Sequence, residues 1–163
     1  MINLQNTYEI IRWYKEYQPW MKNEDWKALY LKLIEEEMNE VEEALKNRNL
    51  EEYLDGIGDV YWVATIYFYL AGEIDNDTYA LLFSFFWATN LKPRKWKEVM
   101  DAIMKEIVKS NFTKSLELQS DWEKAGKVVK GEKFKAPCFK RIIKKWNLDW
   151  ATKEDNKKEK TSK

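Results

Sequence analysis

Along most of the chain, apolar residues recur every three or four positions, the spacing of amphipathic α-helices. Only five Gly and three Pro interrupt this pattern in 163 residues, and no alternation of apolar and polar residues lasts long enough to indicate a strand. The spacing predicts helices over about 5–18, 24–47, 50–71, 76–90 and 94–109. Residues suited to end or cap these helices stand at their boundaries: Pro19, Asn23 or Glu24–Asp25, Gly72, Asn76 or Asp77, and Pro93.

After residue 109 the pattern changes, because residues 110–137 mix turn-forming residues, lysines and short apolar pairs. This segment predicts one short helix followed by irregular chain around Gly126 and Gly131. The stretch "CFKRIIKKW" (138–146) predicts a last short helix, and residues 151–163 lack apolar periodicity, which is typical of a disordered tail. We therefore expect one all-α domain over residues 1–150, a helical bundle with a basic C-terminal arm.

The charges balance overall but are distributed unevenly. Lys plus Arg and Asp plus Glu both number 28, so net charge gives no argument for nucleic acid or membrane binding. Acids gather over residues 35–59 and bases after residue 92. A fold that joins the two regions would form a bipolar cleft, which suits a polyanion together with a divalent metal.

The residue types that are missing restrict the chemistry. The chain has no histidine and a single cysteine, Cys138, which excludes Ser-His triads, histidine bases, cysteine-based zinc sites and an internal disulfide. Carboxylates, lysines and hydroxyls must do any catalysis, and carboxylate oxygens favour Mg²⁺ or Mn²⁺. No signal peptide is visible, and the apolar runs at 60–71 and 79–89 are shorter than the roughly 20 residues that span a bilayer. We expect a cytoplasmic protein without a membrane partner.

The acidic stretch "LIEEEMNEVEEAL" (33–45) divides between two sides of its predicted helix. One stripe, with residues three or four apart, combines apolar and acidic side chains: Leu29, Leu33, Glu36, Glu40 and Ala44. Glu37 lies beside this stripe, whereas other acids fall further round, toward water: Glu35, Glu42 and Glu43. This helix alone is equally compatible with a solvated acidic face and with carboxylates turned inward to hold metal.

The next predicted helix favours the inward arrangement. Glu52, Asp55 and Asp59 share one stripe, and the residues after Asp59 are apolar on all sides, which is typical of a buried helix. An aspartate that enters a buried helix is costly unless it is paired or bound to a metal. The alternative is that Asp55 and Asp59 pair with a nearby lysine or cap a neighbouring helix.

Two glycines lie between these aspartates. Gly56 and Gly58 each weaken a helix by roughly 1 kcal/mol relative to alanine. This cost is easier to explain if another helix or a ligand must approach closely. Two antiparallel helices with carboxylates at such spacings form an oxygen-rich site, which fits Mg²⁺ and its bound waters.

The two acidic motifs together resemble a known family. Residues 36–40 (EEMNE) and 55–59 (DGIGD), the latter continuing as "GDVYWV", are similar to the motifs of the MazG-like all-α nucleoside triphosphate pyrophosphohydrolases. Their relatives include phosphoribosyl-ATP pyrophosphatase and the dimeric all-α dUTPases. The segments "KSNFTKS" (109–115) and "GKVVKGEKFKAP" (126–137) resemble the SNxxK and KxxKGxxxxxP segments of bacterial and phage members. The resemblance spans about residues 30–137 and implies the cytoplasm of a bacterium or of a phage-infected host.

The resemblance implies roles for the acids of the first motif. Glu37, Glu40 and Asp59 would be core metal ligands, with Glu36 as a further ligand or as the base for the attacking water. The implied cofactor is Mg²⁺ or Mn²⁺.

The second motif departs from the family pattern. Many members carry ExxD, which would place a glutamate where Gly56 stands. Asp55, one residue earlier, or Glu52, one turn back, must then supply that oxygen.

The basic arm offers donors for a phosphorylated ligand. Lys114, Lys127 and Lys130, with Ser110 and Asn111, can donate to phosphate oxygens or to a sugar, and Asn111 can instead contact a base edge. Taken alone, these residues describe a solvated basic loop. Together with the acidic helices, they supply the counter-charge that a triphosphate needs.

These observations predict a metal-dependent hydrolase that converts a (deoxy)nucleoside triphosphate to monophosphate and pyrophosphate, with Glu36 or Glu37 orienting the water. dGTP is the first substrate to test, dUTP the second, and a broad housecleaning role the third. The resemblance implies a homodimer or homotetramer, and we expect no nucleic-acid partner. Two rival hypotheses remain: a non-enzymatic helical module that binds single-stranded nucleic acid, and a structural oligomer without a ligand.

Overall fold

The computed structural model describes residues 4–17, 26–72, 93–114 and 130–149. Within these ranges it contains helices and no strand, so the predicted all-α class is confirmed. The helices are α1 (Leu4–Tyr17), α2 (Trp26–Asn47), α3 (Leu50–Ala71), α5 (Pro93–Asn111) and α6 (Lys140–Trp146). The predicted helix at 76–90, its caps, the cap at 23–25 and the tail at 151–163 lie outside the described residues.

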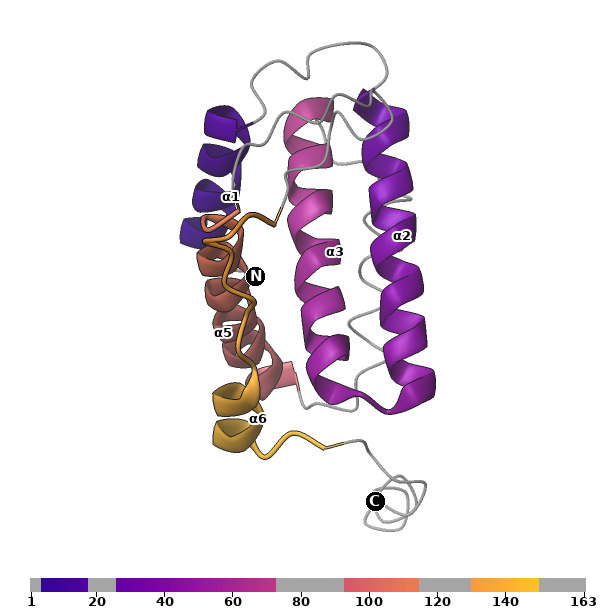
Figure 1. Cartoon of the computed structure of the whole chain (residues 1–163), viewed down its shortest axis with the longest axis vertical. Coiled ribbons are helices and arrows are strands. Elements are labelled where there is room, and N and C mark those ends of the chain that lie inside the picture. The colour runs from indigo at the N-terminus through magenta and orange to yellow at the C-terminus, as the bar shows by residue number, and fades with distance from the viewer. Residues whose placement is uncertain (1–3, 18–25, 73–92, 115–129, 150–163) are drawn as a thin grey trace.

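Helices α2 and α3 form an antiparallel hairpin (Figure 1). Its tight turn depends on Arg48, whose φ of 53° is left-handed, and on Asn49, whose Oδ1 accepts a hydrogen bond from the Glu52 N–H at 3.3 Å. At the other end of α3, Gly72 adopts a φ of 72° and donates its N–H to the Phe68 carbonyl at 3.2 Å. The predicted stop at Gly72 is therefore confirmed.

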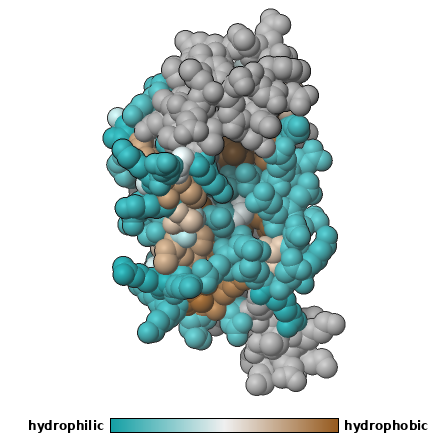
Figure 2. All heavy atoms as spheres, viewed as in Figure 1, coloured by the Kyte–Doolittle hydropathy of each residue, from teal (hydrophilic) through white to brown (hydrophobic). Residues whose placement is uncertain are grey.

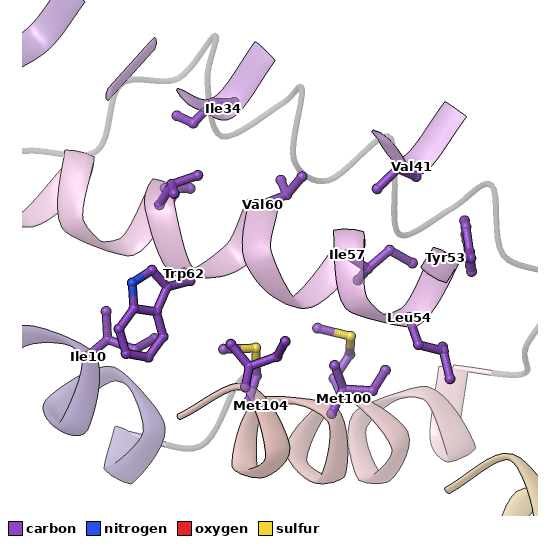
Figure 3. Packing of buried hydrophobic residues seen from close by; sticks show 14 of the residues in the cluster. Ile10, Ile34, Val41, Tyr53, Leu54, Ile57, Val60, Trp62, Met100 and Met104 are labelled. Carbon is purple, nitrogen blue, oxygen red and sulfur yellow. The ribbon is translucent and has the colours of Figure 1, made fainter. Parts of the chain in front are cut away.

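Helix α3 lies at the centre of the bundle, between α2 on one side and α1 and α5 on the other (Figure 1). Its interior positions point in both directions: Val60 toward α2, Leu54 toward α5, and Trp62 toward Ile10 of α1 (Figure 3). The Trp62 ring meets that of Trp13 edge to face, with centroids 5.1 Å apart. This double-sided burial explains why the second half of α3 is apolar on every side.

Both glycines inside α3 mark close helix approaches. A Cβ atom on Gly56 would lie 2.7 Å from Cγ2 of Val41 on α2, and one on Gly58 would lie 2.5 Å from Cγ1 of Ile107 on α5. The prediction that another helix comes close at these glycines is confirmed. Their position brings the acidic part of α3 against α2 and the end of α5.

The most buried residues of α2 lie beside the predicted stripe and share Ala44 with it. Its buried residues are Tyr30, Ile34, Val41 and Ala44. Glu37 continues this spacing and faces α3, and Glu36 and Glu40 flank it, within the predicted range of positions that flank or share the apolar stripe. Burial of Tyr30, Ile34 and Val41 in the core stabilises this rotation, and Leu29 and Leu33 pack at the edge of the same core.

Polar and charged side chains cover most of the described surface in the view of Figure 2. The acids predicted to face water, Glu35, Glu42 and Glu43, are exposed. Among the described residues, no helix combines the length and apolar character that crossing a membrane requires.

Candidate active site

Four carboxylates gather where α2 and α3 face each other. Glu37 and Glu40 come from α2, and Asp55 and Asp59 from the first half of α3. The contact of Gly56 with Val41 fixes the register of the two helices at this level. Glu37, Asp55 and Asp59 are half-buried and Glu40 is exposed at the edge.

Burial and mutual repulsion disfavour the charged forms of the three half-buried acids. Burial, then the charges of Asp59 and Glu40, raise the pKa of Glu37 to about 8. Burial, then the charge of Asp55, raises the pKa of Asp59 to about 7. The pKa of Asp55 is also raised, mainly by burial. Four acids brought together at this cost are typical of a functional site rather than a structural one.

Asp55 carries the clearest unsatisfied group. Its Oδ1 atom is buried and has no hydrogen-bond partner among the described residues. A buried carboxylate oxygen without a partner costs free energy of folding, so it indicates a missing ligand. The alternative of a direct ion pair is not observed for Asp55 or Asp59 within the described ranges.

Two lysines from the basic arm act on this cluster. Lys114, directly after α5, is half-buried; burial lowers its pKa, while Asp59, Glu37 and Asp55 raise it. The charge of Lys130 in turn lowers the pKa of Asp55. The structure thus places two of the predicted lysines beside the acids, and Lys127 lies outside the described residues.

Ser110 and Asn111 occupy the last turn of α5 and are both buried. The Asn111 Nδ2 group donates to the Ile107 carbonyl at 3.1 Å, and the Asn111 carbonyl accepts from Trp13 Nε1 at 3.0 Å. These bonds fix the end of α5 against α1. In this arrangement Asn111 supports the site from inside the fold, and its amide donor is directed to the helix.

Glu36 and Glu52 lie at the margin of the site. Oε1 of Glu36 is 4.0 Å from Nζ of Lys32, one turn back on the exposed side of α2. Glu52 is exposed, and its charge contributes to the raised pKa of Asp55. The structure therefore brings Glu37, rather than Glu36, to the facing acids.

Thr113 was absent from the residues singled out in the sequence. Its Oγ1 atom donates to the Ser110 carbonyl at 2.6 Å and accepts the Lys135 N–H at 2.8 Å. A threonine between the motif residues Asn111 and Lys114 gave a weak signal, because such hydroxyls often close turns after helices.

The site offers oxygen donors, which suit a hard divalent cation. The orphaned Asp55 Oδ1 atom fits such a ligand. With the side chains as they stand, no group of three or more Asp, Glu or Cys residues in the described part of the chain is arranged to hold a metal ion. Binding would therefore require the carboxylates to converge from their present rotamers.

The fold and these acids define an all-α protein with paired acidic motifs on a helical hairpin. The family model of phosphoribosyl-ATP pyrophosphohydrolase matches residues 8–77, which include both motifs. This part of the chain is therefore similar to a family of the MazG-like superfamily, and the predicted resemblance is confirmed. That family consists of pyrophosphohydrolases, hydrolases that act on acid anhydrides, so the predicted enzyme class is confirmed as well. Comparisons with curated proteins and with solved structures gave no match.

Proposed function

We propose that this protein hydrolyses a (deoxy)nucleoside triphosphate to the monophosphate and pyrophosphate, with Mg²⁺ or Mn²⁺ as cofactor. One observation carries the proposal: four acids from two facing helices, including a buried Asp55 oxygen without a partner, lie beside two lysines. Acids alone would suit any cation, and lysines alone any anion. Their combination suits an anionic substrate that arrives with a divalent cation.

Glu37, Glu40, Asp55 and Asp59 are the residues that would hold the metal. When bound, the metal supplies charge neutralisation for the phosphate oxygens and lowers the pKa of a water. Glu52 is the alternative donor at the edge of the same helix.

Glu37 is the better placed of the two proposed bases. Its enclosed position beside Asp59 raises its pKa, and a carboxylate with a raised pKa is a stronger proton acceptor. Glu37 would take the proton of a water that attacks the α-phosphorus, while the bond from that phosphorus to the bridging oxygen breaks. Glu36, on the Lys32 side, would orient the water network.

Lys114 and Lys130 would bind the leaving pyrophosphate. Each carries an ammonium group whose charge reaches the acids, so each can offset the charge that develops on the departing oxygens. Lys127 and Ser110 are proposed to support this contact, and Asn111 to hold the end of α5 that carries Lys114.

A substrate panel tests the proposal. The protein is incubated with all dNTPs and NTPs in Mg²⁺ or Mn²⁺, with dGTP tested first and dUTP second, and the products are separated. Monophosphate plus pyrophosphate supports the proposal, whereas diphosphate plus phosphate contradicts it. Salt-sensitive binding of single-stranded nucleic acid without hydrolysis would favour the binding-module hypothesis instead.

We also propose a homodimer or homotetramer. Leu31 and Leu45 of α2 have exposed fractions of 45% and 37%, apolar area that a second copy can cover. Light scattering of the full chain tests this proposal, and a monomer at micromolar concentration contradicts it.

A further inference from the structure

The Thr113 hydroxyl joins two segments that are separate in the sequence. It donates to the Ser110 carbonyl at 2.6 Å and accepts from the Lys135 N–H at 2.8 Å. A hydroxyl has one proton and free lone pairs, and a backbone N–H can only donate, so both bonds form together in one orientation. Thr113 is therefore a fixed link between the end of α5 and the segment 130–139.

The linked segment carries Lys130. It turns at Gly131, whose carbonyl accepts the Phe134 N–H at 2.9 Å, and Nζ of Lys130 lies 5.1 Å from the centre of the Phe134 ring. From there it runs back along α5 toward α6 (Figure 1). Further along, the Cys138 N–H donates to Oε2 of Glu106 at 3.4 Å, a longer bond. Because Lys135 precedes Cys138 in the sequence, the Thr113 bond is the tether nearer to Lys130, and it is also the shorter of the two bonds.

The same residue also sets the position of Lys114. The Thr113 N–H donates to the Ser110 carbonyl at 2.9 Å, and the Lys114 N–H donates to the Asn111 carbonyl at 3.1 Å. These turns continue α5 and lead Lys114 toward Asp59 and Glu37. The Thr113 side chain adds its own bond to the Ser110 carbonyl in this turn and ties the segment of Lys130 to it.

We propose that Thr113 is a positioning residue for the phosphates of the substrate, because it holds the turn of Lys130 beside Lys114 so that both ammonium groups face one polyanion. The proposal rests on the proposed function. It assigns Thr113 no contact with the reacting atoms. It predicts that the hydroxyl, rather than the bulk of the side chain, determines the affinity for the phosphates.

Calorimetric titration of inorganic pyrophosphate into the Mg²⁺-containing protein tests the proposal. Thr113→Val keeps the shape and removes both bonds, so its pyrophosphate affinity should fall by about tenfold, the worth of roughly one hydrogen bond. Thr113→Ser keeps the hydroxyl and should remain within about twofold of wild type. The matched control is Thr7→Val, which loses a hydroxyl that lies 3.4 Å from the Tyr61 hydroxyl and should bind as wild type does.

Two further measurements separate positioning from folding. The loss in Thr113→Val should largely overlap with that in Lys130→Ala, so the double variant should bind about as weakly as Lys130→Ala alone. Amide exchange of Lys135 should accelerate in Thr113→Val and not in Thr113→Ser. Wild-type affinity in Thr113→Val, or losses that simply add, would overturn the proposal.

The two proposals fail in different ways. If wild type binds pyrophosphate and the Thr113 effects are found, yet no triphosphate is cleaved, the proposed function fails and the positioning role stands. If wild type cleaves triphosphates and Thr113→Val has unchanged KM and pyrophosphate affinity, the positioning role fails alone. A wild type that neither cleaves a triphosphate nor binds pyrophosphate overturns both, and one that cleaves triphosphates without binding pyrophosphate overturns the positioning role alone.

Discussion

Both halves of α3 pack against α2, but only the first half also encloses acidic side chains. The first half carries Asp55 and Asp59 with glycines between them, and the second half carries apolar residues such as Trp62 and Ile66. Burial in the second half stabilises the fold by removing apolar area from water. Burial in the first half raises the pKa of the aspartates and therefore destabilises the ligand-free fold at neutral pH. One helix thus serves stability at one end and chemistry at the other.

The largest effect is expected from variants that remove a negative charge from the acidic site of α2 and α3. Asp59→Asn or Glu40→Gln should reduce pyrophosphate release by about 100- to 1000-fold, because each loses an oxygen charge that the site needs in the transition state. Steady-state rates with the preferred triphosphate check this.

The control for that comparison is Glu43→Gln, an exposed acid on the same α2 helix, which should retain wild-type activity. Circular dichroism confirms that each variant is folded. Folded Asp59→Asn and Glu40→Gln proteins with wild-type turnover would contradict the assignment of the site.

The next effect belongs to the apolar half. Ile66 has an exposed fraction of 1%, so Ile66→Ala should lower the free energy of unfolding by about 2–5 kcal/mol. Denaturant titration measures the loss, and the KM of the remaining folded enzyme should be unchanged. Lys105→Ala, at an exposed position of α5, should stay within about 0.5 kcal/mol of wild type. A change in the KM of Ile66→Ala without a loss of stability would show that the apolar half of α3 also contributes to substrate binding.

A smaller effect concerns the glycine that joins the halves. Alanine favours helices by about 1 kcal/mol over glycine, yet Gly58→Ala should destabilise the protein by about 1–3 kcal/mol, because its Cβ would lie 2.5 Å from Cγ1 of Ile107. Thermal unfolding checks the sign. In an Ile107→Ala background the same change should cost less, since the clashing atoms are gone. Equal costs in both backgrounds would show that the close approach is not the cause.

The last effect is a pH dependence of the metal-free protein. The folded-state pKa values of Glu37 and Asp59, about 8 and about 7, lie above the ordinary values of 4.5 and 3.8. Between those limits the folded state binds more protons than the unfolded state, so the free energy of unfolding should fall as pH rises from about 4 to about 8. Denaturant titrations across this range, in a metal chelator, measure the slope.

The same comparison predicts which variants remove the slope. Glu37→Gln and Asp59→Asn should each flatten the pH dependence, whereas Glu43→Gln should leave it unchanged. A wild-type free energy of unfolding that rises with pH over this window would contradict the inferred crowding of carboxylates.

Local sequence patterns were enough to predict the described helices, the stop at Gly72 and the acidic motifs, because helix periodicity and capping are local properties. The sequence also indicated that Gly56 and Gly58 mark close approaches. It left open which residues of α2 are most buried, because an acidic and an apolar stripe overlap there and the burial of Tyr30, Ile34 and Val41 decides between them.

Tertiary structure alone decided the rest of the site. It turned Glu37 rather than Glu36 toward Asp59, left the Asp55 Oδ1 atom buried without a partner, and tied Lys135 to Thr113. These are relations between segments far apart in the chain. Periodicity shows which face a residue shares with its neighbours along a helix, but the packing of other helices determines what that face meets.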